Sequence, residues 1–178
     1  MRRYFVLSAI GRDRPGLVAE LAELVLECDA NLEDSRMTIL GSEFAVLLLC
    51  SATAPETGDR LASGAKHLER DHGLTILLRE VDAEARPPAP APDVRLYRVE
   101  AAGEDKAGIV ASICKVLAEH GVNIAELSSE SRPGPGGSPH YQMHLRVEVP
   151  GDLDPRVLRE ALEAEADRLV LDVALMPA

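Results

Sequence analysis

The sequence predicts an α+β protein built from two copies of one βαββαβ unit, and three observations support this. The segment from Gly11 to Val18 (GRDRPGLV) recurs as Gly103 to Val110 (GEDKAGIV), and the apolar positions that follow stay aligned without a gap. Strand-like and helix-like hydrophobic patterns follow one another in the same order in both halves. A proline-rich segment separates the halves. A sustained repeat of this kind indicates a duplicated folding unit.

The first unit, residues 1–81, begins with a strand that is interrupted at Gly11. Pro15 suits the first turn of a helix, where a missing N–H costs nothing. The pair Gly41-Ser42 lies between two strand patterns and predicts a tight hairpin, and the apolar run 45–50 predicts a buried central strand. The expected strands are 4–10, 32–40, 43–51 and 74–81, and the expected helices are 17–28 and 55–72.

The segment 82–93 contains four prolines and no large apolar side chain, which predicts an extended linker. The second unit, residues 94–178, repeats the order of the first. Its hairpin differs, because the segment 132–139 is so rich in Gly and Pro that a long irregular loop is expected. The expected strands are 94–102, 123–131, 140–149 and 168–176, and the expected helices are 107–120 and 154–166. The βαββαβ order predicts an antiparallel four-stranded sheet with both helices on one face, the ferredoxin-like arrangement.

Composition argues against several classes of function. The net charge is −11 and neither half holds the cluster of Lys and Arg that direct nucleic-acid binding requires. Aromatic residues make up only 3%, which disfavours base stacking. No apolar run is long enough to cross a membrane, and no signal peptide pattern opens the chain. Cys28, Cys50 and Cys114 form no CxxC pair and are expected to be small buried side chains in a reducing compartment. We therefore expect a cytoplasmic protein.

The duplicated loop is the best candidate for a binding site. In each copy an Asp precedes a Gly by three positions at the start of a helix, as Asp13 and Gly16 and as Asp105 and Gly108. Free N–H groups at a helix start suit a carboxylate, and an Asp side chain can accept hydrogen bonds from an ammonium group. Together these groups would recognise a free α-amino acid. The alternative is that both Asp side chains simply cap their helices.

These motifs resemble the ACT domain, a regulatory module that usually binds small amino acids at an interface between two copies. The resemblance rests on Asp-x-Pro-Gly-Leu-Val at 13–18, on the Asn-Leu and Asn-Ile pairs that open the second strands, and on the βαββαβ order. The Asn residues could equally be turn residues that end the helices. The tandem layout and the Gly/Pro-rich loop resemble the glycine cleavage system transcriptional repressor group.

The resemblance implies two ligand sites, each shared between two copies. The first site would comprise Asp13, Arg14, Pro15, Gly16 and Leu17, facing Asn123 and Ile124. The second site would comprise Asp105, Ala107, Gly108 and Ile109, facing Asn31 and Leu32. Ala107 stands where the family usually has Pro, so the second loop is expected to be less rigid and its site weaker.

Three hypotheses follow for the function. The first is a non-catalytic regulator without cofactor or metal, which binds a small amino acid (glycine or serine by resemblance) and signals to a partner regulator protein. The second is an enzyme for a small carboxylate; against it, His140 and His144 lack further metal ligands, and no P-loop, zinc spacing or nucleophile–base pair is present. The third is an interaction scaffold without ligand. Free sheet edges favour a homodimer in each case.

Overall fold

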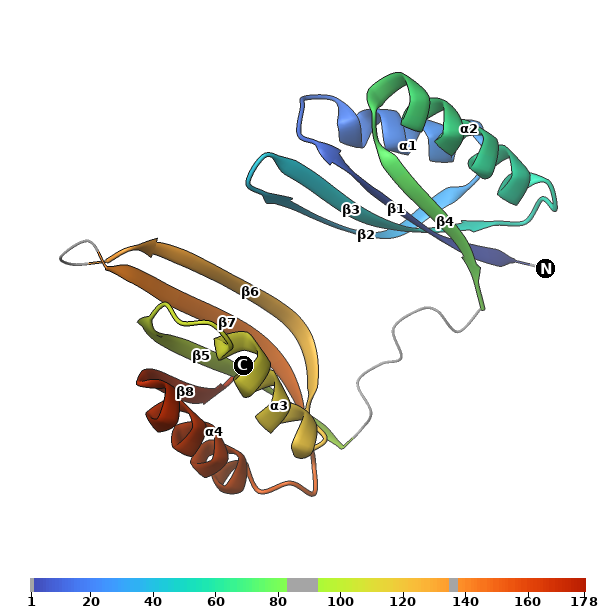
Figure 1. Ribbon diagram of the computed structural model, residues 1–178. Coiled ribbons are helices and arrows are strands. Elements are labelled where there is room, and N and C mark those ends of the chain that lie inside the picture. The colour runs from blue at the N-terminus through green and yellow to red at the C-terminus, as the bar shows by residue number, and fades with distance from the viewer. Residues whose placement is uncertain (1, 83–92, 135–137) are drawn as a thin grey trace. The chain divides into compact units, whose positions relative to one another are not determined.

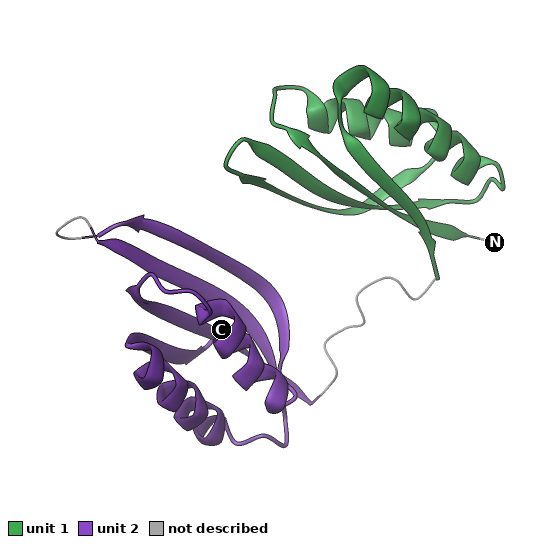
Figure 2. Ribbon diagram, viewed as in Figure 1, with its two compact units in different colours: residues 1–88 green, residues 89–178 purple. Residues whose placement is uncertain are grey.

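The computed structural model describes residues 2–82, 93–134 and 138–178. The chain divides into two compact units, residues 1–88 and 89–178 (Figure 2). The segment predicted as a linker, 82–93, lies outside the described residues except for its two end positions.

Both units have the element order βαββαβ (Figure 1). The elements of the first are β1 (Arg3–Arg12), α1 (Leu17–Glu27), β2 (Asn31–Leu40), β3 (Glu43–Ala52), α2 (Thr57–His72) and β4 (Thr75–Val81). Those of the second are β5 (Val94–Glu104), α3 (Ile109–Glu119), β6 (Asn123–Pro133), β7 (Pro139–Pro150), α4 (Pro155–Leu169) and β8 (Leu171–Pro177). The strand orders are β2-β3-β1-β4 and β6-β7-β5-β8, with every pair antiparallel. The predicted ferredoxin-like fold is confirmed.

The second hairpin is longer than the sequence predicts. β6 and β7 stay paired as far as Pro133 and Pro139, and the N–H of Gly134 donates to Ser138 O at 2.8 Å. A proline is tolerated at the end of a strand because no further ladder hydrogen bond is needed there. Of the irregular loop expected at 132–139, residues 132, 133 and 139 thus belong to strands, and residues 135–137 lie outside the described part.

The last helix also runs further than expected. The sequence predicted a helix at 154–166 and a strand from 168, whereas α4 continues to Leu169 and β8 begins at Leu171. Asp154 caps the helix start, accepting from the N–H of Arg156 at 2.9 Å, with Pro155 in the first turn. Val170 takes a left-handed conformation with φ of 60°, which ends the helix. A β-branched residue rarely adopts this conformation, so the residue type at position 170 does not predict a helix end there.

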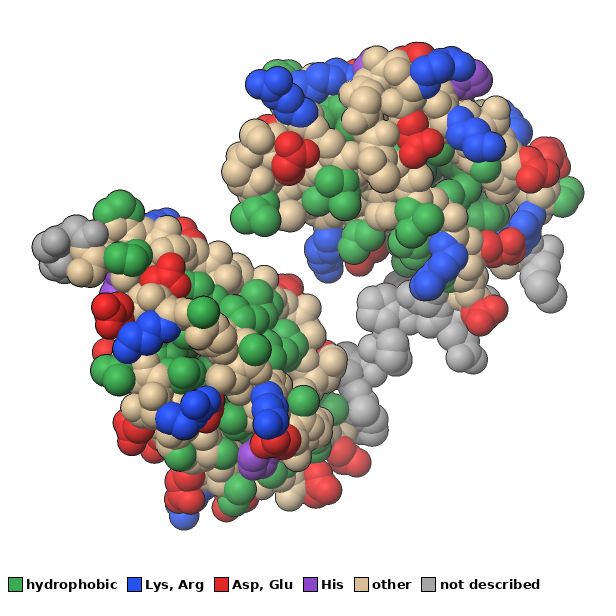
Figure 3. Space-filling view, in the orientation of Figure 1, with side chains coloured by type: hydrophobic (Ala, Val, Ile, Leu, Met, Phe, Trp, Pro, Cys, Tyr) green, Lys and Arg blue, Asp and Glu red, His purple; other side chains and the backbone are tan. Residues whose placement is uncertain are grey.

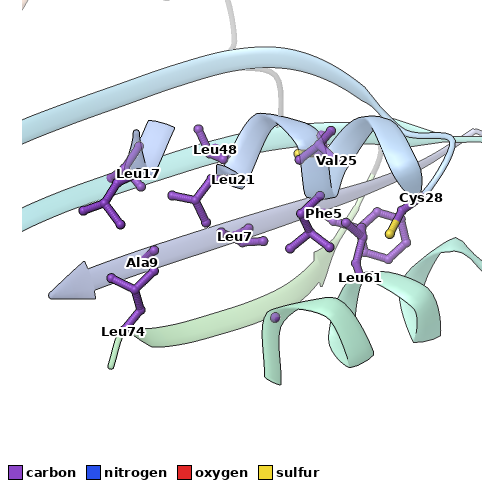
Figure 4. Packing of buried hydrophobic residues seen from close by; sticks show 14 of the residues in the cluster. Phe5, Leu7, Ala9, Leu17, Leu21, Val25, Cys28, Leu48, Leu61 and Leu74 are labelled. Carbon is purple, nitrogen blue, oxygen red and sulfur yellow. The ribbon is translucent and has the colours of Figure 1, made fainter. Parts of the chain in front are cut away.

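The core of each unit lies between the two helices and one face of the sheet. In the first unit, alternate residues of β1 and β3 meet the apolar stripes of α1 and α2 (Figure 4). The largest fully buried side chains there are Phe5, Leu7, Leu17, Leu21, Phe44 and Leu61. The helices approach closely at Gly64, where a Cβ atom would lie 2.1 Å from Leu24 Cδ1. The second unit repeats this packing with its own apolar residues.

The run 45–50, predicted to be a buried central strand, lies in the central strand β3 but is buried on one face only. Val46, Leu48 and Cys50 face the helices and are buried, but Leu47 points the other way and is 53% exposed. Helices cover only one face of the sheet, so an apolar residue on the opposite face stays in solvent.

All three cysteines are free; Cys28 and Cys50 are buried as expected, whereas Cys114 is only half-buried. Burial raises the pKa of the Cys50 thiol to about 11.

A charged contact joins the two helices of the second unit. Arg168 on α4 donates to Glu165 Oε2 at 3.0 Å and to Ser112 Oγ on α3 at 3.3 Å. Hydrogen bonds from Arg168, and secondly from Ser112, lower the pKa of Glu165 to about 2.

No described helix is long and apolar enough to cross a membrane.

Replacing Glu165 by Gln should destabilise the second unit in a pH-dependent way. A carboxyl group whose pKa is lowered by folding contributes stability above its unfolded-state pKa of about 4.3, and that contribution is lost as the pH falls toward the folded value. The urea midpoints of wild type and Glu165→Gln should therefore differ at about pH 6 and converge as the pH is lowered toward about 2. Glu163→Gln, an exposed position on the same helix, is the control. A difference that does not change with pH would contradict this account.

Candidate functional site

The two candidate loops have the same backbone geometry. Each follows the first strand of its unit, and its Asp backbone N–H donates to the hairpin between the second and third strands. Asp13 N–H donates to Ser42 O at 2.9 Å, and Asp105 N–H donates to Pro139 O at 3.1 Å. Both Asp residues are exposed. The fold thus holds both loops beside a hairpin tip, with the Asp side chains in solvent.

Glycine forms the start of both helices. Gly16 and Gly108 are the N-cap residues of α1 and α3, each with φ of 96°, and neither helix has a side-chain cap. The alternative that Asp13 and Asp105 cap their helices is therefore wrong. This φ is costly for a residue with a Cβ atom, which explains why both loops carry Gly at this position.

The helix starts leave backbone N–H groups available. The first N–H groups to bond within the helices belong to Glu20, donating to Gly16 O at 3.0 Å, and to Ser112, donating to Gly108 O at 2.9 Å. The N–H groups of residues 17–19 and 109–111 precede this bonding and can receive an anion. The side chains of Leu17 and Ile109 are buried in the cores. These two predicted site residues can therefore offer a ligand only their backbone.

The first loop is held by an ion pair that sequence reasoning missed. Arg14 donates two hydrogen bonds to Glu20, at 2.8 and 2.6 Å, and His72 Nε2 lies 3.3 Å from Glu20 Oε2. The hydrogen bonds from Arg14 lower the pKa of Glu20 below its ordinary value. Arg14 thereby ties the loop to α1 and is already occupied by a carboxylate. In the sequence, this ion pair is indicated only by the opposite charges of Arg14 and Glu20 on either side of Gly16.

The second loop lacks these anchors. Lys106 stands in place of Arg14 and pairs with Glu104 at 3.4 Å, within its own segment of chain. Ser112 stands in place of Glu20, and Ala107 in place of Pro15. In the described residues the second loop is therefore fixed only by its backbone hydrogen bond and by the helix that follows it.

The two Asn residues open the second strands, so the alternative that they are helix-ending turn residues is wrong. Asn31 begins β2 and donates to Glu33 Oε1 at 3.2 Å; Asn123 begins β6 and donates to Glu148 Oε2 at 2.8 Å.

Leu32 is exposed and lines, with Val18, Leu21 and Met37, a small apolar hollow of about 60 Å³. Ile124 is half-buried against the second core. Asn123 borders a larger open hollow of about 650 Å³.

Within one unit the loop and the Asn lie at opposite ends of the sheet. Along β3, Glu43 pairs with Arg12 next to the loop, whereas Ser51 pairs with Asn31. This separation along the strand is about 27 Å. Along β7, His140 pairs with Glu104 and Glu148 pairs with Asn123 in the same way. Neither unit brings its own two sets of predicted site residues together.

The histidines do not form a metal site with other described residues. His140 and His144 share the outer face of β7, and His144 Nδ1 lies 3.8 Å from Glu100 Oε1. Over residues 2–82, 93–134 and 138–178, no group of three or more His, Cys, Asp or Glu side chains is arranged to hold a metal ion.

Gly16→Ala should destabilise the first unit by about 1–2 kcal/mol, because Ala must adopt a positive φ there. Gly108→Ala should cost the second unit a similar amount, since its φ is the same and a Cβ atom at Gly108 would meet no atom within 4 Å. Urea unfolding measures both. Gly16→Asn is the control, because Asn tolerates positive φ better than Ala. A stabilising Gly16→Ala would show that the backbone conformation is not the constraint.

Comparison with known proteins agrees with this architecture. The ACT domain family is matched at residues 3–78 and again at residues 97–167. The glycine cleavage system transcriptional repressor of Escherichia coli (strain K12) is 30% identical over 166 residues, covering 92% of this chain and 84% of that protein. A UPF0237 protein of Pyrobaculum aerophilum is 37% identical over 83 residues, which are 46% of this chain and 87% of that protein.

Among solved structures, an unknown protein from Galdieria sulphuraria has a TM-score of 0.83 and 32% sequence identity. The match covers 100% of this chain and 99% of that one. One half of this chain thus resembles nearly all of a small protein, and the whole chain resembles proteins of two units. The chain belongs to the ACT domain family and contains two such domains in tandem.

Proposed function

We propose that this chain is a non-catalytic regulatory protein that binds a small amino acid and passes the signal to a partner protein. One observation carries the proposal. Both ACT domains present an exposed Asp beside a helix start whose N–H groups are free of side-chain caps. A negative side chain and a positive helix end, side by side, match the two charges of a free amino acid.

In the proposed complex the ligand carboxylate accepts hydrogen bonds from the backbone N–H groups of residues 17–19. The ammonium group donates to the carboxylate of Asp13, which makes no hydrogen bond through its side chain within the described part of the chain. Gly16 lets the ligand approach the backbone, because it has no side chain of its own at the helix start. The bond between Arg14 and Glu20 keeps Arg14 from competing for the ligand carboxylate.

The complete site is proposed to draw on two units. Because Asn31 lies about 27 Å along the sheet from its own loop, a ligand at Asp13 cannot reach it. The loop of the first unit would instead meet Asn123 and Ile124, and the loop of the second unit would meet Asn31 and Leu32. A ligand that bridges two units stabilises one arrangement of them, and this differential stabilisation is the signal.

Two features suggest that the sites are unequal. The first loop has Pro15 and the pair formed by Arg14 and Glu20, so little conformational entropy is lost when the ligand binds. The second loop has Ala107 and lacks the pair. We infer that the first site binds more tightly.

The relative named as a glycine cleavage system transcriptional repressor supports a role in regulating amino-acid metabolism, and we propose glycine or serine as the ligand. With a net charge of −11, the chain is poorly suited to neutralise DNA phosphates itself. We therefore propose that any effect on transcription passes through a partner regulator in the cytoplasm rather than through direct nucleic-acid or membrane binding.

Calorimetric titration of the full chain with glycine, serine and the other amino acids tests this proposal. We expect saturable heat from at least one of them. Asp13→Ala should weaken the tighter site by about 10- to 100-fold, the value of a charge-assisted hydrogen bond. Asp105→Ala is the matched variant and should leave the tighter site nearly unchanged. Absence of heat from folded protein with every amino acid would favour a scaffold without ligand.

A further inference from the structure

The outer face of the first sheet, on the side away from the helices, is unusually apolar. Leu40 is 77% exposed, Leu77 is 67% exposed, and Ile10 and Leu47 are each 53% exposed. Strand register places these four side chains on the same face as the half-buried Val6 and Leu49. Figure 3 shows hydrophobic side chains along this side of the first unit. We call this surface the outer face of the first unit.

The second unit has a charged surface at the same positions. In the first unit Val6 pairs with Leu49, while at the matching place in the second unit Arg98 pairs with Arg146. The next row outward reads Leu47, Ser8 and Leu77 in the first unit. In the second unit it reads His144, Glu100 and Ala174. The fold therefore does not require apolar residues on this face, and their presence in the first unit calls for another explanation.

The outer face is large enough for an interface. Four strands about 4.8 Å apart, followed for about 25 Å, cover roughly 500 Å². Two such faces in contact would bury about 1,000 Å² in total, the size at which specific protein interfaces begin. An apolar patch of about 300–600 Å² is the largest that a typical monomer exposes, and such a patch often binds a partner.

The charges on the outer face are arranged for self-association. Asp34 on edge strand β2 and Arg79 on the opposite edge strand β4 belong to one row, with Leu49 and Val6 between them. A two-fold axis parallel to the strands would set the β2 edge of one copy over the β4 edge of the other. Each Arg79 would then face an Asp34, whose Oδ1 also accepts from Arg36 of its own chain at 2.7 Å, whereas a two-fold axis across the strands would set the two β2 edges against each other. Arg79 forms no ion pair within residues 2–82, so it is available for this contact.

The two-fold axis parallel to the strands also fits the shape of the surface. A hollow of about 180 Å³ lies over β2 and β3, lined by Val6, Asp34, Arg36, Leu47 and Leu49. Leu77, highly exposed, lies in the same row as Arg36 but on the opposite edge strand. The two-fold axis parallel to the strands brings Leu77 of the second copy over this hollow.

We propose that the outer face of the first unit binds the same face of a second copy of this chain. The two sheets would pack with aligned strands about 10 Å apart. Their centre would contain Val6, Leu47, Leu49 and Leu77, with Asp34 and Arg79 paired at both edges. The matching face of the second unit is a poor occupant, because Arg98 and Arg146 would be buried against apolar side chains. This contact goes beyond amino-acid binding and does not depend on it.

Sedimentation equilibrium of the full chain without amino acids tests the contact. We expect a dimer at micromolar concentration and a dissociation constant raised at least 100-fold in Leu47→Glu. The control, His144→Glu, changes the matching position of the second unit and should leave the dimer intact. Circular dichroism checks that each variant is folded, which the exposure of Leu47 favours.

A charge exchange tests the direction of the two-fold axis. Asp34→Arg and Arg79→Asp should each weaken the dimer about tenfold, and the double variant should regain most of the loss. A wild-type chain that stays monomeric would overturn the proposal and point to a different protein on this face. A dimer that survives Leu47→Glu, or a double variant as weak as the single ones, would also overturn it.

Discussion

The structure depends on one constraint: two helices can cover only one face of a four-stranded sheet. The apolar stripes of α1 and α2 meet alternate residues of β1 and β3, so the core of the first unit forms on that face alone. The opposite face, the edge strands and the ends of the sheet remain in solvent. Each of these three surfaces can then serve a separate purpose, because none of them is needed for the core.

Sequence patterns predicted the elements well because the core imposes them. The helical spacing of Leu17, Leu21 and Leu24 and the duplicated Gly11–Val18 segment led directly to the order of strands and helices. The errors arose where a residue acts against its usual preference. Val170 ends a helix in a left-handed conformation, and the run 45–50 is apolar on both sides although only one side is buried. Periodicity shows that an apolar face exists, but not whether a helix of the same unit covers it.

The candidate site was predictable in its residues and not in its geometry. Asp13 and Gly16 stood out because the pattern recurs, yet the φ of 96° at Gly16 and the ion pair between Arg14 and Glu20 depend on tertiary structure. The distance between the loop and Asn31 likewise follows from strand register rather than from spacing along the chain. That distance gives the strongest reason to look for a ligand between units, since one unit alone offers only half of the predicted groups.

The contrast between the two outer faces shows that the two copies of a duplicated unit can share a fold and differ in their surfaces. Both units keep the core, the glycine at the helix start and the exposed Asp, on which folding and the proposed ligand site depend. They differ on the face that neither requirement touches, where Val6 and Leu49 correspond to Arg98 and Arg146. Association through that face would leave the helix-start loops and the sheet edges uncovered. Self-association and ligand-dependent pairing of units could therefore coexist in one molecule without competing for the same atoms.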